Sequence, residues 1–271
     1  MSAFENFIHF LQAGMDRPGN FETFHICCLA VTLIASIVLA WRFHDASDKT
    51  IRRIIFIFWI TLVVLEVYKQ LVFSLSVSDN IATWDYQWYT FPFQFCSSPL
   101  YAMPFIIFLK DGKIRNAFIS FFATFSFFAG LAVMLYPNDV FINMIGINLQ
   151  TMIHHGTQVA LGVLLVAHNR KRMNKRYFVG SLVVFYIFAA IAMILNEIVH
   201  NHLVQTGSND AFNMFYISPY HDCTLPVLAN IYKMVPYPVF LIIYLIGFAV
   251  VSLIIFGLEK LFVRIICGKN K

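Results

Sequence analysis

The chain has 271 residues, of which 59% are hydrophobic and only 12% are charged, whereas soluble domains carry about 25% charged residues. Its five cysteines form no C-x-x-C pair, so neither a disulfide framework nor a redox motif is indicated. This composition excludes an ordinary soluble domain. It indicates a single integral membrane domain over residues 1–271.

Seven apolar runs follow one another along the chain, each close to the length that crosses a hydrocarbon core of about 30 Å. Inside lipid, every backbone polar group must be satisfied within its own helix. The runs therefore predict an all-α fold, a polytopic membrane helical bundle with seven transmembrane helices. We place the runs at 24–41, 54–77, 91–109, 115–136, 145–168, 177–200 and 235–258.

The basic residues alternate between the connecting segments. Sixteen of the 19 Lys and Arg residues lie in segments 42–53, 110–115, 170–176 and 260–271, whereas the segments between them hold only Arg17 and Lys233. Because Lys and Arg accumulate in cytoplasmic loops, the N-terminus is predicted outside and the C-terminus in the cytosol of a multi-pass protein of the cell membrane. This placement accounts for the net charge of +5 without a nucleic-acid partner.

Two charged residues lie inside the second run, where ionisable side chains are costly and mark functional sites. Glu66 and Lys69 are three residues apart and share a helix face. Either the two charges only neutralise each other inside the bundle, or one of them orients or polarises a substrate group.

A cysteine lies among prolines in the third run. Proline at 99 frees the backbone carbonyl of Phe95, beside Cys96, and broken helices at membrane depth line cavities. We expect Cys96 about one and a half helical turns below the outer end of this run. It is either a small buried hydrophobic residue or a nucleophile.

A histidine pair lies near the middle of the fifth run. Adjacent helix positions point about 100° apart, so we expect only one histidine to face a site. Thr151, His154 and Gln158 form a polar stripe that favours His154 over His155. The alternative is a histidine hydrogen-bonded to a neighbouring helix.

Further polar residues lie at the outer end of the sixth run, where Asn196, Glu197 and His200 can share a face or can simply be solvated at the interface. Together with the residues above, they predict one cavity in the outer half of the bundle. The long sixth segment, 201–234, is a candidate cap over it. The His and Cys spacings match no zinc pattern, so neither a metal nor a cofactor is expected.

The order of several short motifs resembles the YwaF-type family of multi-spanning bacterial membrane proteins. The stretch Phe-Gln-Phe-Cys-Ser-Ser-Pro-Leu-Tyr at 93–101 is similar to that family's cysteine motif, and His154-His155 is similar to its paired histidine. Other similarities are Phe24-His25, Asn213-Met-Phe-Tyr at 213–216, Pro219 and Pro236-Tyr237-Pro238. The closing pattern lacks the tryptophan of the family.

The resemblance implies an activity, because mammalian relatives of this family are regarded as membrane acyltransferases that remodel ether phospholipids. It implies that Cys96 is the nucleophile, that His154 or His155 is the base, and that a phospholipid and a lysophospholipid are the partners. For this chemistry we expect Lys69 to stabilise the anion, and backbone amides near Pro99 or the side chain of Asn196 to serve as oxyanion donors.

Two other functions stay open. A lipid ester hydrolase would use the same residues with water as the acceptor. A transporter of ions or small molecules would use Glu66, Lys69 and Glu197 as an intramembrane charge relay. The sequence does not predict an oligomeric state.

Overall fold

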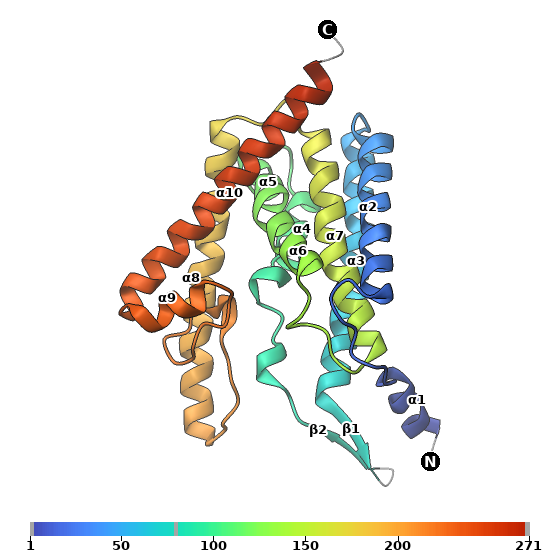
Figure 1. The fold of residues 1–271 in the computed structure, drawn as a ribbon, viewed down its shortest axis with the longest axis vertical. Coiled ribbons are helices and arrows are strands. Elements are labelled where there is room, and N and C mark those ends of the chain that lie inside the picture. Colours follow the sequence, from blue (N-terminus) through green and yellow to red (C-terminus); the bar gives the residue numbers. More distant parts are fainter. Residues whose placement is uncertain (1–2, 79–80, 269–271) are drawn as a thin grey trace.

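The computed structural model describes residues 3–78 and 81–268, which form a bundle of helices with one short hairpin (Figure 1). In chain order the elements are α1 Ala3–Leu11, α2 Thr23–Phe43, α3 Asp48–Ser74, β1 Leu75–Ser78, β2 Ile81–Trp84, η1 Trp88–Thr90, η2 Phe95–Ser97, α4 Pro99–Phe108, α5 Lys113–Phe121, η3 Phe122–Ser126, α6 Phe127–Leu135, α7 Ile145–His168, α8 Lys175–Thr206, η4 Met214–Tyr216, α9 Leu228–Met234 and α10 Tyr237–Gly268.

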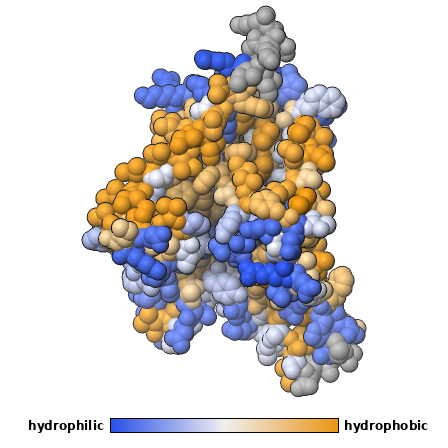
Figure 2. All heavy atoms as spheres, in the orientation of Figure 1, coloured by the Kyte–Doolittle hydropathy of each residue, from blue (hydrophilic) through white to orange (hydrophobic). Residues whose placement is uncertain are grey.

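Five helical segments of the described chain are long and apolar enough to cross a membrane. They are α2, α3, the continuous helix 113–135 that joins α5, η3 and α6, α8, and α10. Figure 2 shows hydrophobic atoms over much of the face that α10 crosses, with hydrophilic atoms above and below them. The predicted all-helical membrane class is therefore confirmed, with five spans that meet both requirements.

The third predicted run does not form a full-length span. Its apolar helix covers only residues 95–108, shorter than the roughly 20 residues that a span needs. Residues 91–94 are not helical, because Pro92 lacks a backbone N–H and favours an extended residue before it. Cys96 therefore lies at the start of this helix and not one and a half turns inside it.

The fifth predicted run forms α7, which is long enough to span but is not among the five helices that are apolar enough to cross a membrane. It packs against α2, α3 and α6, so its polar side chains face protein. Glycines permit this close packing, because a Cβ at Gly156 would lie 2.6 Å from Oγ1 of Thr32, and one at Gly130 would lie 2.6 Å from Cβ of Gln158. Helix α7 is thus the polar centre of the bundle.

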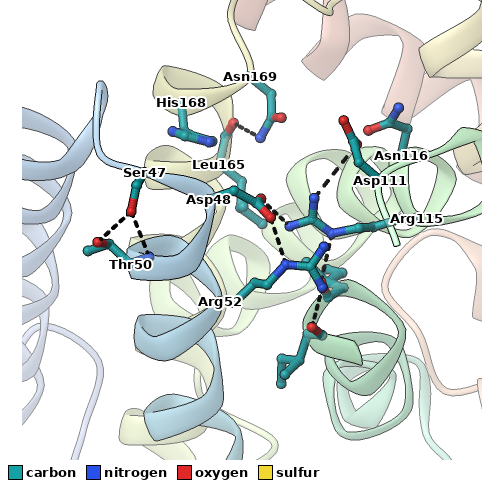
Figure 3. A network of polar contacts seen from close by, with 12 residues as sticks. Ser47, Asp48, Thr50, Arg52, Asp111, Arg115, Asn116, Leu165, His168 and Asn169 are labelled. Carbon is teal, nitrogen blue, oxygen red and sulfur yellow. Dashed lines mark hydrogen bonds and ion pairs between the residues drawn. The ribbon is translucent and has the colours of Figure 1, made fainter. Parts of the chain in front are cut away.

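The loops 44–47, 109–112 and 169–174, which we call the basic end, are joined by ion pairs. Figure 3 shows the neighbouring ion pairs of Arg115 with Asp48 and Asp111. The buried guanidinium of Arg115 donates to Asp48 at 2.6 Å and to the carbonyl of Ile106 at 2.8 Å. Arg172 donates to Asp111 at 2.8 Å. These contacts hold three loops together. The predicted basic tail also includes Lys269 and Lys271, which lie outside the described residues.

The opposite end carries α1, the antiparallel hairpin of β1 and β2, and the segment 207–227, which we call the cap. Helix α1 and the C-terminal end of α10 lie at opposite ends of the molecule (Figure 1). Several cap side chains are almost fully buried, and they are Phe212, Met214, Phe215, Ile217, Ser218 and Cys223. The cap is therefore a packed part of the bundle.

Candidate functional site

Cys96 lies in η2, the short 3-10 turn that begins the third predicted run. It is a free cysteine, and the residue as a whole is partly buried, while the neighbouring Ser97 and Ser98 are buried. A proline at the first position of α4 fits this geometry, because the first helical residue needs no backbone N–H. Cys96 therefore stands in the turn just before the N-terminus of α4.

Two side chains of α7 bind the backbone of Cys96. Nε2 of His154 and Nε2 of Gln158 both donate to its carbonyl oxygen, each at 2.9 Å. A carbonyl only accepts hydrogen bonds, so the hydrogen of neutral His154 is on Nε2. Its Nδ1 is then a lone-pair acceptor, and it is buried without a hydrogen-bond partner, as is Oε1 of Gln158.

His155 is held differently from its neighbour. Its Nδ1 donates to the carbonyl of Thr151 at 2.7 Å, and its Nε2 is buried without a partner. The two imidazole rings lie 5.3 Å apart. The structure thus brings His154, and not His155, into contact with Cys96, and within the described chain no hydrogen bond joins either histidine to the sulfur.

Not every buried histidine in this structure has a ring nitrogen without a hydrogen-bond partner. His25 in α2 is also fully buried, yet its Nδ1 accepts from the backbone N–H of Phe21 at 2.9 Å and its Nε2 contacts the carbonyl of Met134 at 2.7 Å. His25 therefore has a structural role. The unpartnered acceptors of His154, His155 and Gln158 instead indicate a place for a group that donates hydrogen bonds.

The predicted pair in the second run forms a contact. Nζ of Lys69 lies 2.8 Å from Oε1 of Glu66, and Gln70 donates to Glu66 at 2.6 Å and to the carbonyl of Thr90 at 2.8 Å. Both charges also act electrostatically on Cys96 and on His154. The pair is therefore a neutralised ion pair that lies within electrostatic reach of the cysteine and histidine.

Among the described residues, the C-terminal part of α8 makes no hydrogen bond to this cluster. Asn196 is fully buried, and both atoms of its amide bind the backbone of Met214, at 2.7 and 3.1 Å. It is therefore not available as the expected oxyanion donor. Glu197 is exposed and accepts from Tyr220 at 2.5 Å and from Asn201 at 3.0 Å. Asn196 is buried and Glu197 is exposed, so the expected shared face is not formed. Among the described residues, no hydrogen bond or ion pair joins Glu197 to Glu66.

The sequence reasoning did not identify the contacts between the cap and the cysteine turn. Gln94, two residues before Cys96, donates to the carbonyl of Asn213 at 2.9 Å and accepts from the backbone N–H of Phe215 at 3.0 Å. Phe215 and Tyr216 have φ values of 58° and 57°, which L-residues rarely adopt. The sequence signal that could have identified these contacts is Gln94, a single polar side chain in a stretch of aromatic residues and prolines.

Tyr216 of the cap interacts electrostatically with Cys96. Burial raises the pKa of Tyr216 to about 12, and the sulfur of Cys96 acts in the same direction. The phenol therefore keeps its proton at neutral pH and remains a hydrogen-bond donor at the cap side of the cluster.

Two pockets of the structure lie away from this cluster. An apolar one of about 150 Å³ lies between α1 and α3 and is lined by Phe4, Ile8 and Leu71 among others, and a more open one lies along residues 15–26. Among residues 3–78 and 81–268, no group of three or more His, Cys, Asp or Glu side chains is placed to hold a metal ion.

Comparison with known proteins adds a family assignment. The sequence profile of the TMEM164 family matches residues 20–258. No curated protein and no solved structure matches the chain. The profile match includes Cys96, the histidine pair, the cap and nearly all of the helical bundle. This protein therefore belongs to the TMEM164 family, a family of transmembrane proteins.

Proposed function

We propose that this protein is a membrane-embedded acyltransferase that remodels phospholipids through an acyl-thioester on Cys96. The observation that carries the proposal is the 2.9 Å hydrogen bond from Nε2 of His154 to the carbonyl of Cys96. It holds a neutral imidazole against the cysteine and leaves Nδ1 as a buried base without a partner. The relation to YwaF-type proteins and to the mammalian ether-phospholipid acyltransferases is part of this proposal.

The first half-reaction forms the thioester. His154 takes the proton of the Cys96 thiol, either directly or through one water, and the thiolate attacks the carbonyl carbon of a phospholipid ester. The tetrahedral intermediate collapses with cleavage of the ester C–O bond. The lysophospholipid leaves with the proton that His154 returns to its oxygen, and the acyl group stays on sulfur.

The second half-reaction returns the enzyme to its starting state. The hydroxyl of a different lysophospholipid gives its proton to His154 and attacks the thioester carbonyl. The C–S bond breaks, the sulfur regains a proton from His154, and the acyl group leaves on the new lipid. No oxidant or cofactor is needed, because only acyl groups and protons move.

The neighbouring polar groups have supporting roles. The ammonium of Lys69 acts electrostatically on Cys96 and favours a negatively charged sulfur. Its pairing with Glu66 keeps the resting site neutral. Gln158 donates a hydrogen bond to the same carbonyl as His154. Its Oε1 has no partner and is an acceptor for the hydroxyl of the incoming lipid.

The arrangement in the membrane belongs to the same proposal. We place α7 and the short helix 95–108 within the bilayer beside the five apolar helices, giving seven membrane segments with the N-terminus outside and the cytosolic basic end facing the anionic inner leaflet. The polar side chains of α7 tolerate this depth because they are buried against neighbouring helices. The cap and Cys96 then belong to the outer half, in the cell membrane.

Trapping of the acyl-enzyme tests the proposal. The full chain in lipid nanodiscs is incubated with a phospholipid carrying a labelled acyl group, then quenched and treated with hydroxylamine, which cleaves thioesters. We expect a hydroxylamine-sensitive adduct on the wild type, none on Cys96→Ala, and at least about a hundredfold slower formation on His154→Ala, the range of general-base effects. Cys28→Ala, a partly buried cysteine of α2, is the matched control and should label normally.

The acceptor is tested in the same assay. Adding a lysophospholipid to the labelled enzyme should move the label to a new phospholipid, whereas release of free fatty acid alone would identify a hydrolase. Full labelling of Cys96→Ala, or no adduct on wild-type protein with several lipid classes, would disprove the proposed chemistry.

A further inference from the structure

The apolar pocket of about 150 Å³ between α1 and the C-terminal end of α3 has no role in the chemistry around Cys96. Its walls include Phe4, Phe7 and Ile8 of α1 and Leu71 of α3. None of the residues that line it is charged. Such walls offer water few hydrogen-bond partners, so an apolar occupant is favoured over water.

Hydrogen bonds fix α1 in place beside α3. The side-chain amide of Gln12 donates to the carbonyls of Val72 and Leu75, at 3.1 and 2.8 Å. The phenol of Tyr68 donates to the carbonyl of Leu11 at 2.6 Å. The carbonyls at the end of a helix lack partners within that helix, so these bonds also complete the end of α3. The pocket is therefore a built part of the fold.

An exposed apolar stripe on α3 leads to the pocket. Its members are three or four residues apart, so they share one helix face, and they are 38–61% exposed, namely Ile57, Ile60, Val64, Val67 and Leu71. The stripe rises about 21 Å at 1.5 Å per residue, most of a hydrocarbon core of about 30 Å. Because α3 is long and apolar enough to cross a membrane, this stripe faces acyl chains. Its last member, Leu71, also lines the pocket.

Helix α1 has the pattern of a helix that lies in a membrane interface. Phe4, Phe7 and Phe10 follow one another around it and are 49%, 54% and 74% exposed. Its polar side carries the exposed residues Asn6 and His9. A helix with such an apolar and such a polar side lies in the plane of the interface. Figure 1 shows α1 beside the hairpin, at the end of the molecule away from the basic end.

We propose that this pocket binds an acyl chain of a membrane lipid, and that α1 lies in the interface and covers that chain. The chain lies along the stripe of α3, and its ester end is next to α1. The apolar walls recognise the chain, so the headgroup is not selected. This lipid is a resident and not a substrate, because none of the residues that line the pocket belongs to the cluster around Cys96.

Photocrosslinking of lipid chains tests the site. The full chain is placed, one copy per nanodisc, in phosphatidylcholine that contains a small share of a diazirine-labelled analogue, and the crosslinked residues are mapped by mass spectrometry. Two analogues are compared, with the diazirine near the ester or near the terminal methyl group. We expect the first to label residues 4–11 and 71–75, and the second to label α3 around Ile57 and Ile60.

Matched variants on the stripe show whether the pocket itself is needed. Leu71→Trp fills the pocket and should abolish the labelling of residues 4–11, and Phe7→Asn, which removes part of the α1 wall, should weaken it. Val64→Trp enlarges a residue of the same stripe outside the pocket and should leave the labelling unchanged. All three positions are partly exposed, and the thermal unfolding midpoint of each variant shows that it is folded.

Two further arms separate this site from headgroup binding and from acyl transfer. The same diazirine chain on phosphatidylglycerol should label residues 4–11 as strongly as it does on phosphatidylcholine. Cys96→Ala should be labelled like the wild type whether or not Cys96 forms a thioester. The pocket and the proposed enzymatic activity can therefore fail independently.

Four outcomes would overturn the proposal. The first is labelling of the exposed Leu258 and Leu261 of α10 without labelling of residues 4–11. The second is labelling of residues 4–11 that persists in Leu71→Trp, and the third is labelling that changes with the headgroup. The fourth is a dimer in larger nanodiscs that Leu71→Trp dissociates, which would assign the pocket to a second copy of the chain.

Discussion

The buried amide of Asn196 is one of the anchors of the cap, and its removal gives a prediction whose size follows from the structure. Asn196 is fully buried, accepts from the backbone N–H of Met214 at 2.7 Å and donates to the carbonyl of Met214 at 3.1 Å. Asn196→Ala leaves the backbone N–H of Met214 buried without a partner and its carbonyl with only the 3.4 Å hydrogen bond from the backbone N–H of Ile217, at about 1–3 kcal/mol for each bond lost. We expect a loss of about 2–4 kcal/mol in the free energy of unfolding, because Gln94 still anchors the cap.

The assay combines equilibrium unfolding in mixed micelles with limited proteolysis. Asn196→Ala should unfold at lower denaturant and should be cut faster within residues 207–227, while cleavage at the basic end is unchanged. Asn201→Ala is the control on the same helix, since Asn201 is exposed and makes one contact, to Glu197; its free energy should change by less than about 0.5 kcal/mol. An Asn196→Ala protein as stable as the control would refute the reasoning.

Two further predictions concern helix packing and the ion pairs. Gly130→Ala should cost about 1–3 kcal/mol, because its Cβ would lie 2.6 Å from Cβ of Gln158, whereas Gly247→Ala, with no atom within 4 Å, should cost nothing in the same unfolding assay. The hydrogen bonds from Arg172 hold the pKa of Asp111 below its ordinary value of 3.8. Stability from this exposed pair, about 1 kcal/mol at most, is therefore present above that value and lost as the pH falls through the lowered pKa. Asp111→Asn should remove that part of the acid dependence in pH-resolved unfolding, and a profile identical to the wild type would contradict it.

Residue pattern alone predicted most of the helices. Apolar runs of spanning length, separated by polar loops, predicted a helix in each of the seven places, and the ends of α2, α3 and α7 lie within a few residues of the predicted ones. The signal is strong because a lipid environment permits little besides helices. The third run was wrong in length, since counting apolar residues ignores the prolines that keep residues 91–94 out of the helix.

The candidate site was predictable only as a set of residue types. The cost of burying ionisable groups selected Glu66, Lys69 and the histidine pair, and helical periodicity favoured His154 over His155. Periodicity cannot show what a side chain meets on another helix. It therefore missed that His154 and Gln158 share the carbonyl of Cys96.

The sequence by itself thus determined the membrane class, the helices and the short list of polar residues, because those follow from local composition and from the cost of polarity in lipid. Only the tertiary structure decided which of those residues meet. It paired Asn196 with the cap and exposed Glu197. These outcomes depend on contacts between residues far apart in the chain, and local pattern carries no information about such contacts.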